Sequence, residues 1–267
     1  MAAALTSGKG IIRKSTNRER IFNPSFNVRQ VLLRFIVANW HHAKLAARLS
    51  QGRQILKQPM TLSRTLPVGF IAPCLPTNAP QPPSGEQWLH EIKHDGFRVI
   101  ARKTDGRVRL YSRPGNALTY RFPLIAEAIA RLRPRSCIID GEAVACRDDG
   151  MADFNRIRYR HHDAEVFLYA FDLIELNGDD LRRDPLQVRK ATLASVIARA
   201  GSGLRFNEHM EETDGLLVFQ HACKLGLEGI VSKRRDSRYR SGRSPDWIKS
   251  KNPNAPAVKR EAEEDWR

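Results

Sequence analysis

The pair Asp105-Gly106 is the feature of this sequence that most limits the folds open to the chain. It separates two strand-like runs, residues 97–103 and 107–112, which are rich in apolar and β-branched side chains. An Asp-Gly pair between two such runs is typical of the two-residue turn of a β-hairpin, because both positions readily adopt the positive φ that the turn needs. We therefore expect the two strands to pair antiparallel, unlike the strands of a regular parallel sheet built from strand–helix repeats.

The chain from residue 84 onward continues this irregular alternation. Residues 123–132 carry apolar side chains at helical spacing and begin with a proline, which suits the first turn of a helix. The further strands are expected at residues 87–92, 137–146, 166–176, 228–233 and 247–251, and the further helices at residues 185–200 and 215–225. Hairpins with helices between them favour an α+β fold of antiparallel sheets flanked by helices.

The composition points to a polyanionic partner. The 267 residues carry a formal net charge of +16 at pH 7, and nucleic acid is the most economical partner for such a charge. The four cysteines lack the paired spacing of a zinc site, so we expect reduced thiols in a cytosolic protein. Because no apolar run is long enough to cross a membrane, a membrane protein is disfavoured as well.

Residues 1–65 form a separate basic extension, with twelve lysines and arginines against a single acid, Glu19. Apolar side chains recur at helical spacing in residues 28–50, which predicts a basic amphipathic helix there. Three roles stay open for the extension: a loosely packed appendage, an arm that embraces DNA, or an organelle-type transit peptide. The proline-rich residues 73–83 are expected to be a linker or a wrapped lead-in to the domain that follows.

The most informative run is residues 91–98, whose sequence is Glu-Ile-Lys-His-Asp-Gly-Phe-Arg. Taken alone, this run could be a strand that ends in an Asp-Gly turn beside a surface lysine. Five further segments with distinctive charged and aromatic residues follow it. They are residues 111–116, 139–142, 169–173, 228–233 and 243–251.

In order and approximate spacing, these six segments resemble the motifs of the adenylation domain of ATP-dependent DNA ligases. They are most similar to the ligase module of bacterial end-joining ligases, and the resemblance covers about residues 66–254. It implies an ATP-grasp-like nucleotidyltransferase domain, in agreement with the α+β fold expected above. The chain would then consist of the extension at 1–65, the adenylation domain at 66–254 and a charged C-terminal tail at 255–267.

By this resemblance, Lys93 attacks the α-phosphate of ATP and carries AMP as a phosphoramidate. Free lysine has a pKa near 10.4 and is almost wholly protonated at pH 7, so the amine needs activation to become a nucleophile. Lowering that pKa to about 8 takes roughly 3 kcal/mol, which nearby cations or desolvation can supply. The residues implied for catalysis are Lys93, Asp95, Lys249 and Lys251.

The resemblance also implies a nucleotide site and a metal site. The nucleotide would contact Glu91, Ile92, Lys93, Arg98, Arg113, Glu142, Phe171, Lys233, Arg243, Lys249 and Lys251. Glu91 would meet the adenine amino group, and Phe171 would stack on the adenine ring. Glu142 and Glu228 would hold Mg²⁺ (or Mn²⁺), since two carboxylates completed by water and phosphate oxygens suit that ion.

These positions also have plainer interpretations. Phe171 belongs to an apolar strand, where an aromatic side chain is more often part of the core than a platform for a base. Glu142 and Glu228 could be exposed strand residues. Lys249 and Lys251 could form a charged sheet edge that blocks aggregation.

Ligases of this type normally continue into an OB-fold domain that carries a last basic motif, and residues 254–267 are too few to form such a barrel. We therefore expect a minimal ATP-dependent DNA ligase, with the adenylation domain only, that acts in DNA repair with slow self-adenylation and weak, salt-sensitive nick sealing. An RNA ligase, a capping-type nucleotidyltransferase and a non-catalytic DNA-binding remnant stay open as alternatives. The expected partners are nicked double-stranded DNA and other end-joining or repair proteins. The expected state is a monomer in the cytoplasm, associated with the nucleoid.

Overall fold

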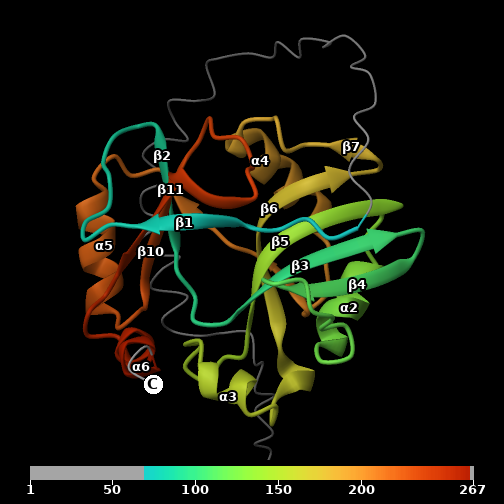
Figure 1. Ribbon diagram of the computed structural model, residues 1–267, viewed down its shortest axis with the longest axis horizontal. Coiled ribbons are helices and arrows are strands. Elements are labelled where there is room, and N and C mark those ends of the chain that lie inside the picture. The colour runs from blue at the N-terminus through green and yellow to red at the C-terminus, as the bar shows by residue number, and fades with distance from the viewer. Residues whose placement is uncertain (1–68, 265–267) are drawn as a thin grey trace, which may run out of the picture.

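The computed structural model describes residues 69–264, and two β-sheets dominate this part of the chain (Figure 1). The first sheet consists, in spatial order, of β1 (Cys74–Asn78), β11 (Gly242–Lys251), β10 (Gly229–Arg234), β2 (Trp88–Ile92) and β9 (His209–Met210). The second sheet consists of β4 (Arg107–Ser112), β3 (Phe97–Thr104), β5 (Ser136–Val144), β6 (Phe167–Leu176) and β7 (Asp179–Asp180), with β8 (Leu204–Phe206) beside β6. Of these strand pairs, only β1 with β11 and β6 with β8 are parallel.

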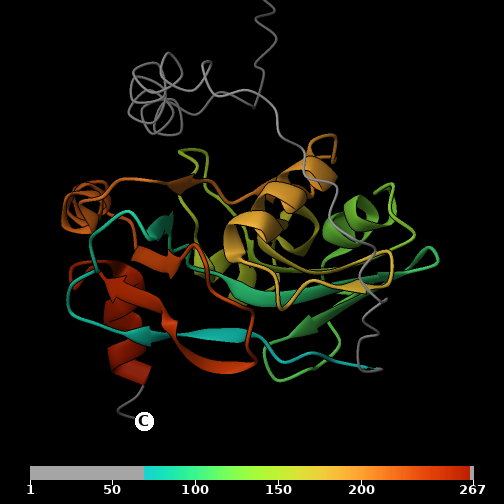
Figure 2. The same cartoon turned by 90° about the horizontal axis from the view of Figure 1, so that it is seen from above.

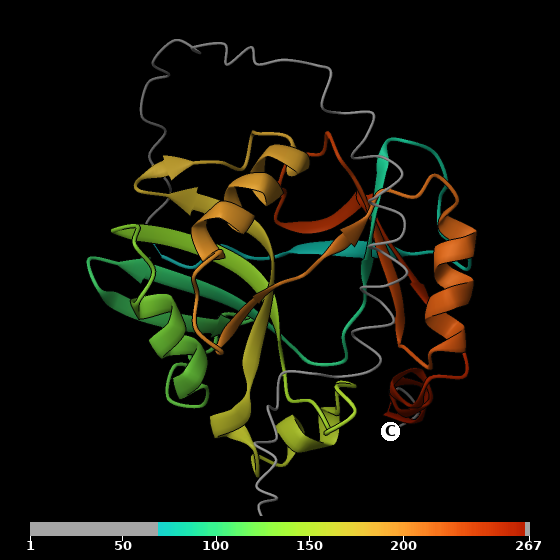
Figure 3. The same cartoon turned by 180° about the vertical axis from the view of Figure 1, so that it is seen from behind.

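Some of the helices pack on the outer faces of the two sheets, and the others lie at one end of the sheets (Figures 2 and 3). The helices are α2 (Pro123–Ala130), α3 (Phe154–Arg158), α4 (Leu186–Ile197), α5 (Gly215–Lys224) and α6 (Pro256–Glu264), with a 3-10 turn, η1, at Asp163–Glu165. This arrangement confirms the expected α+β fold of antiparallel sheets flanked by helices. Among the described residues, no helix combines the length and the apolar character that a membrane crossing requires.

The second sheet is buried on both faces, which explains why its strands are apolar almost throughout. Val99 and Ala101 on β3 belong to the main core, which also contains residues of α2 and α4. Ile100, between them, belongs to a second core together with Leu89 of β2 and Trp247 of β11. Since successive side chains of a strand point to opposite faces, one face lies under the helices and the other against the first sheet.

The first sheet is apolar on its outer face under α5, whereas its inner face mixes charged side chains with apolar ones such as Leu89 and Trp247. Val218 and Ala222 of α5 pack with Ile230 of β10 on the outer face. Lys233, three residues further along β10, points the other way, since its Nζ lies 4.1 Å from the ring centre of Phe171 on the second sheet. Charged side chains are thus enclosed between the two sheets.

The predicted turn at Asp105-Gly106 is confirmed, and the structure has a second turn of the same kind. Asp105 and Gly106 have φ angles of 45° and 81° and connect β3 to β4. Asn177 and Gly178, with φ angles of 50° and 97°, connect β6 to β7 in the same way. The predicted helices at 123–132, 185–200 and 215–225 correspond to α2, α4 and α5.

The prediction of a linker or lead-in at residues 73–83 is wrong for its first half, because Cys74–Asn78 form β1. This strand lies at the edge of the first sheet and pairs only with β11. Pro76 lacks a backbone N–H, and an edge strand tolerates that loss because one side of it needs no partner strand.

Several short elements were not predicted at all, namely α3, β7, β8 and β9. The structure also places a helix, α6, where the sequence shows only a charged tail. The helix expected at residues 28–50 lies outside the described residues.

Candidate active site

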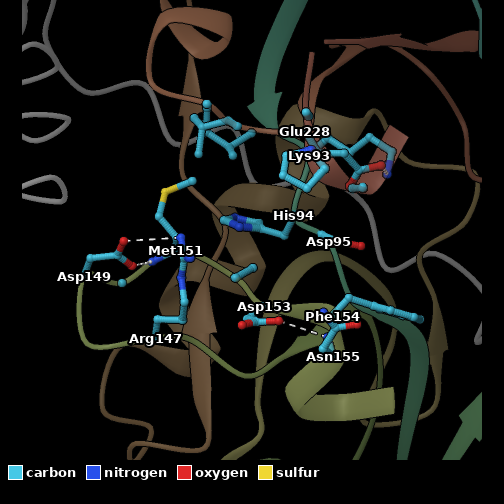
Figure 4. A pocket seen from close by; sticks show the side chains of 18 of the residues that line it. Lys93, His94, Asp95, Arg147, Asp149, Met151, Asp153, Phe154, Asn155 and Glu228 are labelled. Atoms are coloured by element: carbon cyan, nitrogen blue, oxygen red, sulfur yellow. Dashed lines mark hydrogen bonds and ion pairs between the residues drawn. The ribbon is translucent and has the colours of Figure 1, made fainter. Parts of the chain in front are cut away.

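Lys93 follows directly on β2 and is held at both its backbone and its side chain. Its N–H donates to the carbonyl oxygen of Gly229 at 3.0 Å, which ties the chain to the start of β10. Its Nζ donates to Oε1 of Glu228, and the Lys93 side chain keeps 20% of its surface exposed (Figure 4). The amine is therefore reachable from solvent while it is held against an acidic partner.

The register of the first sheet brings distant segments of the chain together. Glu91 lies opposite Val231, and Val231 lies opposite Lys249. In the next row, Gly229 lies opposite Lys251. Residues that face each other on neighbouring strands project from the same face of a sheet. Both lysines of β11 thus project from the face that carries Glu91, and both are half-buried there.

The second sheet contributes Glu142, which lies opposite Arg98. Burial raises the pKa of Glu142 to about 7, and the nearby carboxylates of Glu228 and Asp140 add to this rise, although Arg98 and Lys93 oppose it. Glu142 thus belongs to the second sheet, while Glu228, the partner of Lys93, directly precedes β10 of the first sheet.

Glu142 and Glu228 are suited to share a divalent cation. Within residues 69–264, no group of three or more His, Cys, Asp or Glu side chains is arranged to hold a metal ion by itself. Mg²⁺, however, usually binds one or two carboxylates and completes its shell with water and substrate phosphates. A carboxyl group whose pKa is raised by burial and by like charges is stabilised as an anion by a nearby cation. The residues therefore fit an ion that arrives together with a phosphorylated ligand.

Glu91 is the centre of a buried charge network. Its oxygens accept from Nζ of Lys190 at 2.8 Å, from Nζ of Lys233 at 2.7 Å and from Nδ2 of Asn207 at 3.1 Å. Burial alone would raise the pKa of Glu91, but the two lysines outweigh burial and lower it to about 2. Glu91 is consequently an anion at all ordinary pH values, and it orients two ammonium groups between the sheets.

Phe171 lies on β6 with cations on its ring. The guanidinium of Arg98 lies 4.4 Å from the ring centre, and Nζ of Lys233 lies 4.1 Å from it. Arg98 is fixed by a two-pronged ion pair with Asp140, at 2.5 and 2.7 Å. Asp140 also accepts from the hydroxyl of Tyr239 at 2.6 Å. The positive groups beside Phe171 are therefore held in place before any ligand binds.

The other predicted nucleotide residues lie nearer the rim. Arg113 is exposed in the loop after β4. Arg243 is exposed on β11, with Nη1 at 3.4 Å from the carbonyl oxygen of Pro76. Ile92 ends β2 opposite Ile230, and its side chain packs on the outer face with α5. If Ile92 contacts a ligand on the inner face, only its backbone can do so.

A cavity of about 300 Å³ opens beside Lys93 (Figure 4). Its walls come from the Lys93 loop, Glu228, residues 147–155 and the start of α6. His94 forms part of the wall, with its ring stacked 4.0 Å from that of Tyr169. Glu91 and Phe171 do not line this cavity. The structure thus places Lys93 between two spaces, the cavity on one side and the charged inter-sheet region on the other.

This arrangement can be compared with known proteins. The family model of the ATP dependent DNA ligase domain matches residues 74–251, which is most of the described chain. The chain belongs to this family. The resemblance drawn from the six sequence motifs is thereby confirmed.

Relatives of this ligase-family domain include a multifunctional non-homologous end joining protein, LigD, of Pseudomonas aeruginosa. It is 41% identical over 186 residues, which are 68% of this chain and 22% of LigD. The DNA ligase-like protein LigB, derived from the SPbeta prophage of Bacillus subtilis, is 31% identical over 67% of each chain. This chain therefore spans about a fifth of the length of LigD relatives.

Solved structures give the same assignment. The ligase domain of M. tuberculosis LigD has a TM-score of 0.60 and 34% identity, over 67% of this chain and 59% of that chain. A mycobacterial DNA ligase D in complex with ATP and MES matches with the same TM-score and identity, over 67% of this chain and 60% of that one. The fold is thus that of the LigD ligase domain.

Two buried residues of this ligase-family domain were missed from the sequence. Lys190 holds Glu91, and Arg189 forms a fully buried ion pair with Asp172, at 2.8 Å for each of its two contacts. Both lie on the buried stripe of α4, among Leu186 and Leu193. A pair of basic residues at core-facing positions of a helix is the signal that could have revealed them, because buried charges require partners.

Proposed function

We propose that this chain is an ATP-dependent DNA ligase module that forms a covalent AMP adduct on Lys93 and uses it to seal nicks in DNA. In the first step, Nζ of Lys93 would form a bond to the α-phosphorus of ATP, and pyrophosphate would leave. The 5′-phosphate of a nick would then take the AMP and release the lysine. Finally, the 3′-hydroxyl would attack that phosphate and expel AMP.

The observation that carries the proposal is the position of Lys93 against Glu228, with Glu142 on the facing sheet. Glu228 stabilises the charged form of Lys93, which cannot act as a nucleophile. We propose that Glu142 and Glu228 hold Mg²⁺ (or Mn²⁺), which would neutralise phosphate charge when bound. A cation held by Glu142 and Glu228 would also offset the negative charge of Glu228, which would favour the neutral form of the Lys93 amine.

The remaining residues are proposed to hold the nucleotide. Lys249 and Lys251 project from the inner face of the first sheet and would neutralise charge on the α-phosphate. Arg98 would contact the ribose side, where Asp140 fixes its guanidinium. Phe171 would stack on the adenine ring. The remaining proposed contacts are Glu91, Ile92, Arg113, Lys233 and Arg243, with Asp95 orienting the loop of Lys93.

DNA is the proposed acceptor because of the net charge of +16 and the family of the domain. We further propose action as a monomer in the cytoplasm, near the nucleoid, alongside other end-joining proteins. A panel of nicked duplexes with DNA or RNA strands, with AMP transfer measured in rising salt, tests the acceptor. Preference for an all-RNA nick, or for GTP over ATP, would overturn this part of the proposal.

The adenylation step is tested by incubating the protein with ATP labelled in its α-phosphate, in the presence of Mg²⁺, and separating the protein on a denaturing gel. Label on the wild type and none on Lys93→Ala is the expected result. Lys224→Ala is the matched control, because Lys224 is an exposed lysine at the end of α5. An unlabelled wild type, or equal label on Lys93→Ala, contradicts the proposal.

A further inference from the structure

Helix α6 returns the chain to the loop that carries Lys93. Nη2 of Arg260 donates to Oδ1 of Asp95 at 2.7 Å. The guanidinium of Arg260 also lies 4.3 Å from the ring centre of Phe154, on α3. Both members of the ion pair are largely buried, with 21% of the Arg260 side chain and 19% of the Asp95 side chain exposed. Asp95 is thus held by a residue that lies more than 160 positions further along the sequence.

The start of α6 is fixed to the segment that holds Lys93. The N–H of Asn252 donates to the carbonyl oxygen of Glu228 at 2.8 Å, and its Nδ2 donates to that of Leu227 at 2.9 Å. Ala255 and Ala257 are buried at the beginning of the helix. The chain just before helix α6 is therefore anchored to the backbone of Glu228, the partner of the Lys93 amine.

The loop itself has little freedom on its other side. A Cβ added to Gly96 would overlap with the carbonyl oxygen of Ala143 on β5. The loop therefore lies in direct contact with the second sheet immediately after Asp95. The cavity beside Lys93 lies next to this loop, and Figure 4 shows Asp149 and Asp153 as further carboxylates around it.

On these observations, we propose that Arg260 is a positioning residue for Lys93. It neutralises Asp95 at the cavity wall, fixes the turn two residues after Lys93, and so keeps the Lys93 amine at Glu228. This assignment rests on the proposed function, since it concerns the nucleophile of that reaction. Arg260 itself is not proposed to touch the nucleotide.

The first test measures the rate of AMP adduct formation against ATP concentration. Arg260→Ala is expected to slow the maximal rate by about 10- to 100-fold, because a displacement of about 1 Å at a reacting group has effects of that size. The ATP concentration at half-maximal rate should change by less than about 3-fold, since the nucleotide contacts remain. Arg260→Lys should recover most of the rate, as it keeps the charge opposite Asp95.

Coupling to Asp95 is tested with Asp95→Asn and the double variant Asp95→Asn/Arg260→Ala. If Arg260 acts through Asp95, the double variant is no slower than the slower single variant. If the double variant is slowed by the product of the two single-variant effects, the assignment is overturned. An Arg260→Ala variant with the wild-type rate would overturn it as well. Lys259→Ala is the matched control, because Lys259 is the exposed, equally charged neighbour on α6, and the wild-type rate is expected for it.

A second readout needs no enzymatic activity. An amine-acetylating reagent, followed by peptide mass spectrometry, reports how far each lysine is exposed. Arg260→Ala should label Lys93 several-fold faster than the wild type does, whereas the buried Lys190 and Lys233 stay protected. Unchanged labelling of Lys93, or labelling of the buried lysines as well, would overturn the assignment. If the wild type forms no AMP adduct, the proposed function is refuted. The acetylation experiment still tests whether Arg260 positions Lys93.

Discussion

Replacement of Lys190 by methionine tests whether the buried charge network is built as described. Lys190 is 1% exposed, and its Nζ donates to Glu91 and to the carbonyl oxygens of Phe171 and Asn207. Methionine matches its length but leaves the buried Glu91 carboxylate with Lys233 and Asn207 alone. Removing one partner of a buried ion pair costs about 3–5 kcal/mol.

The expected loss for Lys190→Met is somewhat smaller, because Glu91 keeps one lysine. The lowering of the Glu91 pKa from 4.5 to about 2 corresponds to roughly 3 kcal/mol of net stabilisation of its charge. Burial lowers the pKa of Lys233 in spite of Glu91, so part of this gain is offset by the cost of burying that ammonium. We therefore expect the free energy of unfolding to fall by about 2–4 kcal/mol.

Urea unfolding measures this loss as a lower midpoint at an unchanged slope. In a Glu91→Gln background the same substitution should cost at least about 2 kcal/mol less, because no buried anion remains to be left without its partner. Lys224→Met is the control, since an exposed lysine is expected to contribute less than about 0.5 kcal/mol. A Lys190→Met variant as stable as that control would refute the network.

Two further predictions concern stability. Because the pKa of Glu91 is lowered in the folded state, the contribution of Glu91 to the free energy of unfolding is complete above pH 4.5 and is lost as the pH falls toward 2. When the free energy of unfolding is measured against pH, the wild type should show this loss and Glu91→Gln should lack it. Gly96→Ala should destabilise the domain by about 1–3 kcal/mol, because its Cβ meets the backbone of Ala143. Gly201→Ala, where a Cβ meets nothing within 4 Å, should change thermal unfolding little, and equal effects of the two alanines would contradict the packing described.

The local parts of the fold could be predicted from the sequence. Asp105-Gly106 determines a turn by the φ angles of two residues alone, so the β3–β4 hairpin needed no knowledge of the rest. The helix α2 has both a proline start and an apolar stripe. The ligase motifs identified the family because they recur in a fixed order, and the family model matches the range that contains them.

The assembly of the site could not be predicted in the same way. The alignment of Glu91 with Val231 and Lys249 depends on the pairing of β2 with β10, two segments about 140 residues apart, and on the pairing of β10 with β11. No local pattern encodes this register. The strand β1 was concealed by its proline, which is tolerated only because the strand lies at an edge. The contact of Arg260 with Asp95 has no sequence signal, since nothing in the sequence distinguishes Arg260 from its exposed neighbour Lys259.

Lys190 is intermediate between the features that the sequence predicts locally and those that depend on distant segments. Its position on the apolar stripe of α4 was visible in the sequence, as was that of Arg189. Interpreting a basic residue on such a stripe as a buried ion-pair partner requires knowing that an acid faces it. Glu91 lies 99 residues away.

The central claim is that the amine of Lys93 is the nucleophile. Intact mass spectrometry after incubation with ATP and Mg²⁺, followed by peptide mapping, tests it most directly. A single adenylyl adduct located on Lys93, and absent from Lys93→Ala, is the predicted result. An adduct on another lysine, or none on a folded wild-type protein, would contradict the account.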